Sequence, residues 1–182
     1  MDKRKIENLR VKASITEALF SLLEEKSISA ISVSEIIERA HVARASFYRN
    51  YASKESVIPT MMTDMLESFR QTVVYEDGNY YVYENIYRSF AFFKLYQKQV
   101  LDLHRFGYGS IVLDTLNRFH AEITGTLPDA SIEKYQRYIY IGALYNTAMR
   151  WLQSDAKESI EQISEMFYRV CVEQMQPQMG EL

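Results

Sequence analysis

The sequence contains few of the residues that interrupt helices or cross-link a chain. Its 182 residues include only six glycines and three prolines, which favours long helices over a sheet of many strands. A single cysteine, Cys171, excludes an internal disulfide framework and fits a reducing compartment. No apolar run approaches the roughly 18 residues needed to span a bilayer, and the basic start of the chain has no apolar segment behind it. We therefore expect a cytoplasmic protein without a membrane segment.

Charge is unevenly divided along the chain. Residues 1–58 carry 10 Lys and Arg against 8 Asp and Glu, a net charge of +2, and the remainder carries 11 against 16, a net charge of −5. The two parts together give the net charge of −3 of the whole chain. A mildly basic front on an acidic remainder fits a nucleic-acid-binding head, but ordinary scatter of surface charge explains the difference equally well.

Hydrophobic periodicity predicts helices along most of the chain. Apolar stripes with helical spacing indicate helices over residues 3–26, 33–40, 43–50, 53–74, 80–97, 98–104, 109–124, 131–153 and 157–175. The predicted fold is all-α, with about nine helices. It divides into a three-helix head over residues 1–52 and a larger helical domain over residues 53–182. The helix over 131–153 is apolar on more than one face and is expected to be buried on both sides.

Two local patterns make sharper predictions about helix geometry. Residues 32–35 form a capping box, in which the Ser32 hydroxyl accepts from the amide of Glu35 and the Glu35 side chain reaches back. Pro59 lies about six residues into the helix expected over 53–74. There it would remove one backbone hydrogen bond, so a bend is expected.

The three front segments, with a tight join at residues 41–42 before the third, form a helix-turn-helix arrangement. Within the third segment, residues 43–50, only Phe47 is expected to point inward, and the rest is small or polar. A helix that reads the major groove of DNA needs an outer face with hydrogen-bond donors and without bulky apolar side chains. The third segment meets that requirement.

Several side chains in and beside this segment suit contacts to DNA. Arginine binds guanine edges or phosphate, asparagine binds adenine edges, and tyrosine and serine hydroxyls are typical phosphate donors. A helix N-terminus favours an anion, which adds Lys54 and the start of the 33–40 helix. The candidate DNA contacts are Ser32, Ser34, Arg44, Ala45, Ser46, Tyr48, Arg49, Asn50 and Lys54. Taken alone, each charged residue also fits a solvated surface, and only the surrounding motif favours DNA.

These same residues carry a resemblance to a known family. The matching features are Val33…Ile36-Ile37…Ala40, Val42-x-Arg44-Ala45-Ser46-x-Tyr48 and Tyr51-x-x-Lys54-Glu55. With them, residues 32–57 closely resemble the head of the tetracycline-repressor (TetR) family. The family pattern covers about the first 58 residues, and the remaining two thirds match it only in length and helical layout.

The resemblance implies a function and an assembly. It implies a homodimeric DNA-binding transcriptional regulator of a family whose members are usually repressors. A dimer should bind a pseudo-palindromic operator, and release by a small-molecule ligand stays an open alternative. The helices over about 131–153 and 157–175 would pair with those of a second copy as a four-helix bundle. The resemblance also assigns Tyr48 and Lys54 to phosphate, and it places Arg44, Ala45 and Ser46 on the recognition helix.

Two positions depart from the family pattern. His41 occupies the turn position that is usually glycine, and histidine adopts a left-handed conformation better than most other residues, at some cost. Ala43 replaces the serine that usually caps the recognition helix, which typically gives up ~1 kcal/mol of capping. Both departures bear on how rigidly the recognition helix is held.

Aromatic residues are abundant in the middle of the chain, which contains 14 Tyr and 9 Phe in all. Taken singly, most of them are better explained by core and dimer packing. As a set, they could equally well include the lining of a pocket for a small aromatic or apolar ligand. The candidate ligand-binding residues are Tyr87, Phe90, His104 and Phe119.

Other classes of function find little support in the sequence. The three histidines, His41, His104 and His120, are not spaced as metal ligands, and there is no phosphate-binding glycine loop or nucleophile elbow. We therefore predict no metal, no cofactor and no enzymatic activity. A helical adaptor that binds only protein stays open as an alternative, although it would need no set such as Arg44, Tyr48 and Lys54.

Overall fold

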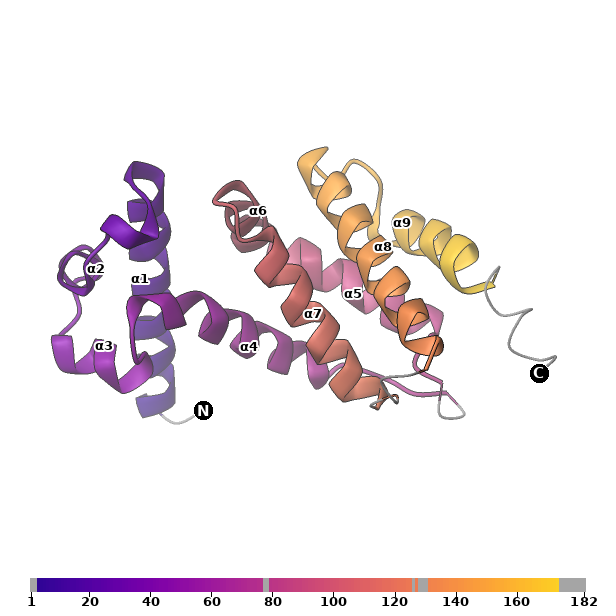
Figure 1. The fold of residues 1–182 in the computed structure, drawn as a ribbon, viewed down its shortest axis with the longest axis horizontal. Coiled ribbons are helices and arrows are strands. Elements are labelled where there is room, and N and C mark those ends of the chain that lie inside the picture. Colours follow the sequence, from indigo (N-terminus) through magenta and orange to yellow (C-terminus); the bar gives the residue numbers. More distant parts are fainter. Residues whose placement is uncertain (1–2, 77–78, 126, 128–130, 174–182) are drawn as a thin grey trace. The chain divides into compact units, whose positions relative to one another are not determined.

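The structure is a computed structural model that describes residues 3–76, 79–125, 127 and 131–173. Within these residues the α-helices are α1 (Lys3–Glu25), α2 (Val33–Ala40), α3 (Arg44–Asn50), α4 (Val57–Arg70), α5 (Tyr83–Leu95), α6 (Gln97–Arg105), α7 (Gly109–Thr124), α8 (Glu133–Gln153) and α9 (Ile160–Tyr168) (Figure 1). Short 3-10 turns are η1 (Ile28–Ala30) and η2 (Lys54–Ser56), and a π-helical turn, η3 (Arg169–Glu173), continues α9. The all-α prediction is confirmed. The end of the helix predicted over 157–175 falls outside the described residues.

The chain divides into two compact units, the head (residues 1–65) and the body (residues 66–182). The sequence-based boundary lay earlier, between residues 52 and 53. The first part of α4 groups with the head because its apolar residues Val57, Ile58 and Met62 are buried and Asp64 accepts a 2.6 Å hydrogen bond from Lys12 of α1. The boundary between the two units therefore falls within α4. No helix in the described part of the chain is long and apolar enough to cross a bilayer.

The start of α4 corrects the expectation for Pro59. The sequence indicated a helix from residue 53, but the α-helix begins at Val57, after the 3-10 turn η2. Pro59 is thus the third residue of the helix. Proline is tolerated in the first turn, where its missing N–H removes no intrahelical hydrogen bond. Pro59 therefore removes no hydrogen bond within α4, and the reason for expecting a bend there does not apply.

The core of the head forms because α1 presents a stripe of apolar residues to α2 and α3. Ile15, Ile36 and Phe47, one from each helix, are fully buried. At the rim of this core, Arg39 of α2 donates 2.7 Å hydrogen bonds to Ser21 and Glu25 of α1. Burial of an aliphatic or aromatic side chain of this size contributes about 1.5–3 kcal/mol, so the apolar contacts outweigh the exposed ion pair in fixing the three helices together.

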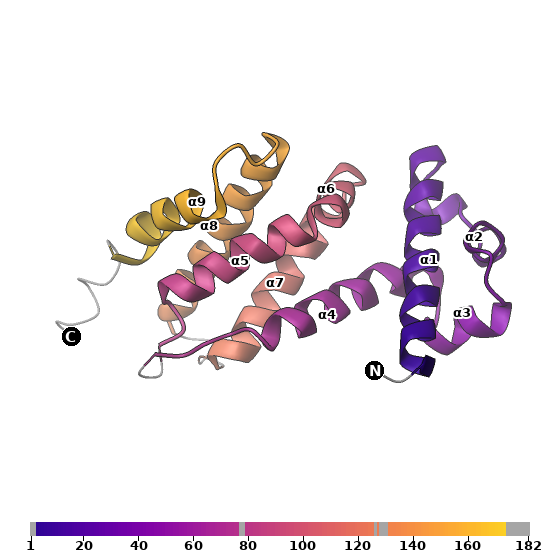
Figure 2. The same ribbon diagram turned by 180° about the vertical axis from the view of Figure 1, so that it is seen from behind.

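The body is a helical bundle in which α5 packs against α9 and α7 packs against α8. α8 lies in front of α5 in Figure 1 and behind it in Figure 2. Phe90 of α5 is fully buried, with its ring centroid 5.8 Å from that of Trp151 and 5.7 Å from that of Phe167. These three aromatic residues join α5, α8 and α9.

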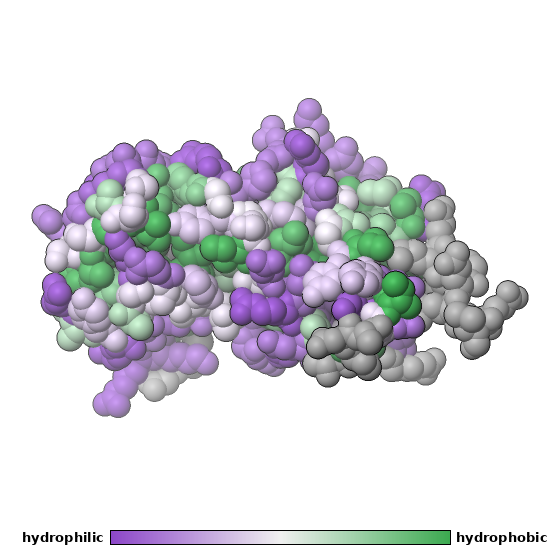
Figure 3. Space-filling view, in the orientation of Figure 1, coloured by the Kyte–Doolittle hydropathy of each residue, from purple (hydrophilic) through white to green (hydrophobic). Residues whose placement is uncertain are grey.

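The surface of α8 differs from the prediction that this helix is buried on both sides. Leu144, Ala148 and Leu152 are buried in the body, as expected for one side. On the other side, however, apolar side chains face outward, and the exposed fractions are 72% for Ile132, 54% for Tyr135, 55% for Tyr138 and 59% for Ile139. Figure 3 shows apolar residues gathered on the face of the body where α7 and α8 lie foremost. A single chain therefore covers only one side of α8.

Candidate nucleic-acid interface

The α2–turn–α3 segment has the local geometry that its sequence predicts. The Ser32 hydroxyl accepts a 3.2 Å hydrogen bond from the Glu35 amide, and the Ser32 amide donates to the Glu35 carboxylate at 2.8 Å. His41 is left-handed, with φ 52° and ψ 42°. Ala43 occupies the N-cap of α3 and provides no side-chain hydrogen bond. The capping box, the left-handed turn and the missing cap are all confirmed.

Helix α3 is held by its inner face. Phe47 is fully buried and Tyr51, just after the helix, is only 2% exposed. The ring of Phe47 lies 5.7 Å from that of Tyr51 and 5.4 Å from that of Tyr48. A helix of seven residues is too short to be stable by itself, so this aromatic anchor is what keeps it in place.

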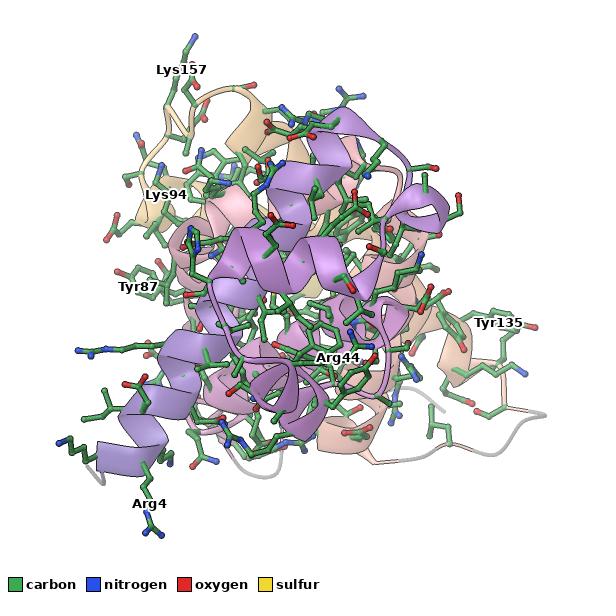
Figure 4. All side chains as sticks on the ribbon, turned by 90° about the vertical axis from the view of Figure 1, so that its left-hand side faces the viewer. Arg4, Arg44, Tyr87, Lys94, Tyr135 and Lys157 are labelled. Carbon is green, nitrogen blue, oxygen red and sulfur yellow. The ribbon has the colours of Figure 1, made fainter. Side chains whose placement is uncertain are left out.

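The outer face of α3 is polar and exposed, and Figure 4 looks onto the end of the head that carries Arg44. Arg44, Ala45, Tyr48 and Arg49 are all exposed. The Arg44 guanidinium donates to Ser34 Oγ and to the Tyr48 hydroxyl, each at 3.4 Å, and lies 5.4 Å from the centre of the Tyr48 ring. Hydrogen bonds of this length are at the weak end of the range, so these donors are readily available to a stronger acceptor.

Ser46 and Asn50 are less available than Arg44. Both are half-buried. The Asn50 side-chain amide donates a 2.9 Å hydrogen bond to the Ser46 carbonyl, while the Ser46 hydroxyl accepts from Arg49 at 3.4 Å. Asn50 therefore already uses a donor to satisfy a backbone carbonyl in the last turn of α3. Its second N–H and its Oδ1 are left for an adenine edge, so its role as a reader of bases stays a prediction.

Lys54 has a structural role that the sequence did not reveal. Its ammonium donates to the carbonyl of Ser29 at 3.1 Å and to the carbonyl of Ile31, and only 17% of its side chain is exposed. It thus ties the segment before α4 to the connection between α1 and α2. An ammonium group has three donors, so one N–H is left for a further acceptor such as phosphate, beside the Glu55 carboxylate 3.8 Å away.

The N-terminus of α2 is already occupied by a carboxylate. Glu35 accepts from the amide and the hydroxyl of Ser32, at 2.8 and 2.9 Å, and from the ammonium of Lys26. The Lys26 bond first, and then the bonds from Ser32, lower the pKa of Glu35 to about 2. Ser32 is therefore engaged within the chain, and the exposed Ser34 is the better placed of the two for a phosphate.

The structure does not bring the four predicted ligand-binding residues together. Phe90 is in the aromatic core, and Phe119 packs with Leu66 and Phe69. Tyr87 donates to Glu161 at 3.3 Å, and His104 Nδ1 lies 3.4 Å from the Tyr145 hydroxyl. None of the four lines the cavity of about 550 Å³ in the body, although Phe119 lines a smaller one of about 30 Å³.

The larger cavity has a volume of about 550 Å³, and all of its lining residues belong to the body. Its walls include Tyr75, Tyr80, Tyr81, Arg137, Tyr140 and Cys171. The three tyrosines from residues 75–81 belong to the aromatic region noted in the sequence. No local pattern, however, connects them with Arg137 and Tyr140 of α8, because only tertiary packing brings the segment between α4 and α5 to that helix.

Comparison with known proteins agrees with this geometry. Residues 15–59, which span α2 and α3, match the family described as "Bacterial regulatory proteins, tetR family". An uncharacterized HTH-type transcriptional regulator, YxbF, from Bacillus subtilis (strain 168) is 29% identical over 185 aligned positions, which cover 87% of this chain and 44% of that protein. The chain thus spans less than half the length of this relative.

Solved structures share the fold over most of the chain. A TetR transcriptional regulator from Streptococcus agalactiae 2603V has a TM-score of 0.57 at 19% identity, covering 92% of this chain and 97% of that one. The fatty acid degradation regulator FadR from Bacillus halodurans has a TM-score of 0.55 at 15% identity, covering 91% and 96%. At these identities the likeness shows the fold alone.

Proposed function

We propose that this chain is a TetR-family regulator that represses transcription by binding a pseudo-palindromic operator as a homodimer in the cytoplasm; the family match over residues 15–59 and the HTH-type relative support this. The observation that carries the proposal is the outer face of α3. That helix buries a single aromatic residue, Phe47, and exposes Arg44, Tyr48 and Arg49. Their donors are held only by long hydrogen bonds, which a phosphate or a base edge can replace.

The roles within the interface follow from chemistry and exposure. Arg44 is the side chain for a guanine edge, because its planar guanidinium bonds O6 and N7 together. Tyr48 and Ser34 carry exposed hydroxyls and suit phosphate. Ala45 is exposed and small, so it permits close approach to the groove and can touch a thymine methyl group. The third donor of Lys54 adds a phosphate contact at the edge of the head.

The exposed side of α8 supports the homodimer. Tyr135, Tyr138 and Ile139 face outward along α8, and Met166 and Val170 are exposed on α9 and the turn that follows it. In Figure 4 the Tyr135 side chain points away from the body. A group of exposed apolar residues on a soluble domain marks an interaction surface. A second copy of α8 and α9 would cover it, and a homodimer has the two recognition helices that two half-sites roughly 34–36 Å apart require.

Regulation by a small molecule requires a difference between two states. A ligand in the body weakens operator binding only if it binds one arrangement of the two heads better than the other. Helix α4 is the element through which such a difference would pass, because the boundary between head and body lies within it. We therefore propose that α4 transmits the effect of a ligand in the body to the head.

A gel-shift titration tests the DNA-binding proposal. The full chain is titrated onto duplex DNA from upstream of its own gene at several salt concentrations, with a shuffled duplex as competitor. Tight binding that weakens linearly on a log–log plot against salt is expected, because phosphate contacts release counterions. A folded protein that binds neither duplex at low salt would contradict the proposal and would leave the helical adaptor.

The dimer has its own test. Ile139→Glu places a charge in the exposed apolar side of α8 and should convert the dimer to monomer in sedimentation velocity. Gln153→Glu, at the exposed end of the same helix, is the matched control and should leave the dimer intact. A dimer that survives Ile139→Glu would show that α8 is not the interface.

A further inference from the structure

We propose that the cavity in the body binds a small aromatic anion, with the ring held among tyrosines and the acid group on Arg137. The inference deepens the proposed function, on which its regulatory meaning rests, by naming the chemical class of the ligand. At about 550 Å³, the cavity is within the roughly 300–1,000 Å³ typical of small-molecule sites. It is formed by the α4–α5 connection, the end of α7, the first half of α8 and the turn η3.

The walls of the cavity suit a flat ring. Tyr75, Tyr80, Tyr81 and Tyr140 all line it. The centroids of the Tyr80 and Tyr81 rings are 5.5 Å apart with an interplanar angle of 86°, and those of Tyr81 and Tyr140 are 5.0 Å apart with an angle of 81°. Rings set edge to face offer both faces and edges to an aromatic guest.

On both sides of residues 77–78, hydrogen bonds hold the segments that carry three of these tyrosines. The fully buried Asn85 donates to the carbonyls of Val74 and Tyr80, both at 2.7 Å, and accepts from the Val74 amide at 3.0 Å. The Tyr75 hydroxyl donates to the Ile123 carbonyl at 2.5 Å. A wall held in this way loses little conformational freedom on binding, which favours affinity.

Arg137 gives the cavity its positive charge. Its guanidinium donates to the carbonyl of Thr124 at 3.3 Å and to that of Gly125, so the end of α7 orients it. Its positive charge also acts on Tyr81, on the cavity wall, and partly offsets the rise in the pKa of Tyr81 that burial causes. Five N–H donors are available on a guanidinium, and donors therefore remain for a carboxylate or sulfonate.

The other titratable groups around the cavity do not cancel this charge from within. Burial raises the pKa values of Tyr80, Tyr81, Tyr140 and Cys171, which keeps these groups uncharged at neutral pH. His120, whose ring stacks 5.5 Å from that of Tyr140, is neutral too, because burial first and Arg137 second lower its pKa to about 4. The one carboxylate on the lining, among the described residues, is Glu133, which is exposed and accepts from the Ser131 hydroxyl.

The cavity also contains a polar group that needs a partner. The Tyr140 hydroxyl is buried and has no hydrogen-bond partner among the described residues, and neither has Nε2 of His120. A buried hydroxyl without a partner is unfavourable, because it has lost its hydrogen bonds to water and gained none in the protein. A ligand oxygen that lay beside Arg137 and accepted from the Tyr140 hydroxyl would remove that penalty, whereas a hydrocarbon would leave the hydroxyl without an acceptor.

A matched pair of fluorescent probes tests this assignment without DNA. 1-Anilinonaphthalene-8-sulfonate and N-phenyl-1-naphthylamine have the same rings and differ only in the sulfonate group. We expect the full chain to bind the sulfonate at least tenfold more tightly. Arg137→Gln should abolish that preference, while Arg150→Gln, on the same helix but outside the cavity lining, should retain it. Tyr140→Phe should weaken the sulfonate more than the neutral probe.

The location is tested independently by filling the cavity. Gln136 is exposed and on the lining, so Gln136→Trp should block both probes without disturbing the core. Equal affinity for the two probes in the wild type, or an unchanged preference in Arg137→Gln, would overturn the assignment. So would tight binding of both probes to Gln136→Trp. Since no DNA is present, a chain that failed the gel shift would still give a clear result on the cavity.

Discussion

The head and the body expose opposite kinds of helix face. Helix α3 buries Phe47 and turns Arg44 and Tyr48 outward, whereas α8 buries Leu144 and Ala148 and turns Tyr135 and Ile139 outward. A polar face with weakly held donors fits a charged, hydrated partner such as DNA, and an aromatic face fits a second protein surface. The head and the body are both all-helical, but the residues that they expose suit different partners.

The largest expected effect is a loss of folding stability and of duplex binding when the core of the head is disrupted. Phe47→Ala removes the aromatic anchor of α3 and should cost about 3–5 kcal/mol of unfolding free energy. Duplex binding should be lost in the gel shift, while dimerisation and probe binding by the body persist. Phe90→Ala, which removes an equally buried ring from the body, is the matched control and should impair the body instead. Loss of probe binding in Phe47→Ala would contradict independent units.

The second prediction concerns the body, whose folding stability should depend on pH through His120. The pKa of His120 is about 4 in the folded chain, against an ordinary value of 6.5. The unfolded chain therefore binds the extra proton first as the pH falls. Stability contributed by neutral His120 is complete above pH 6.5 and is lost between about pH 6.5 and 4, by up to about 3 kcal/mol. Chemical denaturation at several pH values measures it.

The control for that titration is His120→Phe, which removes the titrating group and keeps a ring in the aromatic cluster. Its stability should fall less steeply than that of the wild type across the same pH window. Parallel curves for the two proteins would show that His120 is not the group responsible.

A smaller effect is expected for single contacts on the outer face of α3. Arg44→Ala should weaken operator binding by about 1–3 kcal/mol and relax the preference at one base pair. Tyr48→Phe keeps the ring and loses only the hydroxyl, so it should weaken all duplexes about equally. Gel shifts with single-base operator variants measure both. If Arg44→Ala weakened every duplex equally, Arg44 would be a phosphate contact and not a reader of bases.

The smallest expected effect is a gain in stability of the head when the missing N-cap hydrogen bond of α3 is supplied. Ala43 caps α3 without a side-chain hydrogen bond, so Ala43→Ser should stabilise the head by about 1 kcal/mol. Ala45→Ser, inside the helix, is the control and should give no gain. Thermal unfolding measures both, and a neutral or destabilising Ala43→Ser would show that the cap geometry is unsuitable.

Local features of the head could be predicted from the sequence because neighbouring residues decide them. The capping box at Ser32, the left-handed His41 and the uncapped Ala43 depend on a few consecutive positions, and all three are confirmed. Sequence reasoning failed where distant residues decide. Lys54 is held by carbonyls about 25 residues earlier in the chain, and the cavity combines Tyr75, Arg137 and Cys171, which no spacing connects.

The start of α4 is an intermediate case. The apolar stripe continues through η2 into α4, so periodicity alone does not reveal that the first turn is 3-10 and that Pro59 stands near the helix start. The same continuity concealed the boundary between the units at residue 65. Both features depend on whether the apolar residues of this segment pack into the head or into the body. Tertiary contacts decide this, and hydrophobic periodicity does not reveal them.

The most direct test of the central claim is hydrogen–deuterium exchange of the full chain with and without its operator duplex. The account predicts slower exchange over residues 32–54 when the duplex is bound, with the exposed side of α8 unaffected at constant dimer concentration. Slower exchange confined to α8 and α9, with residues 43–50 unchanged, would contradict the claim that the polar face of α3 is where this protein meets DNA.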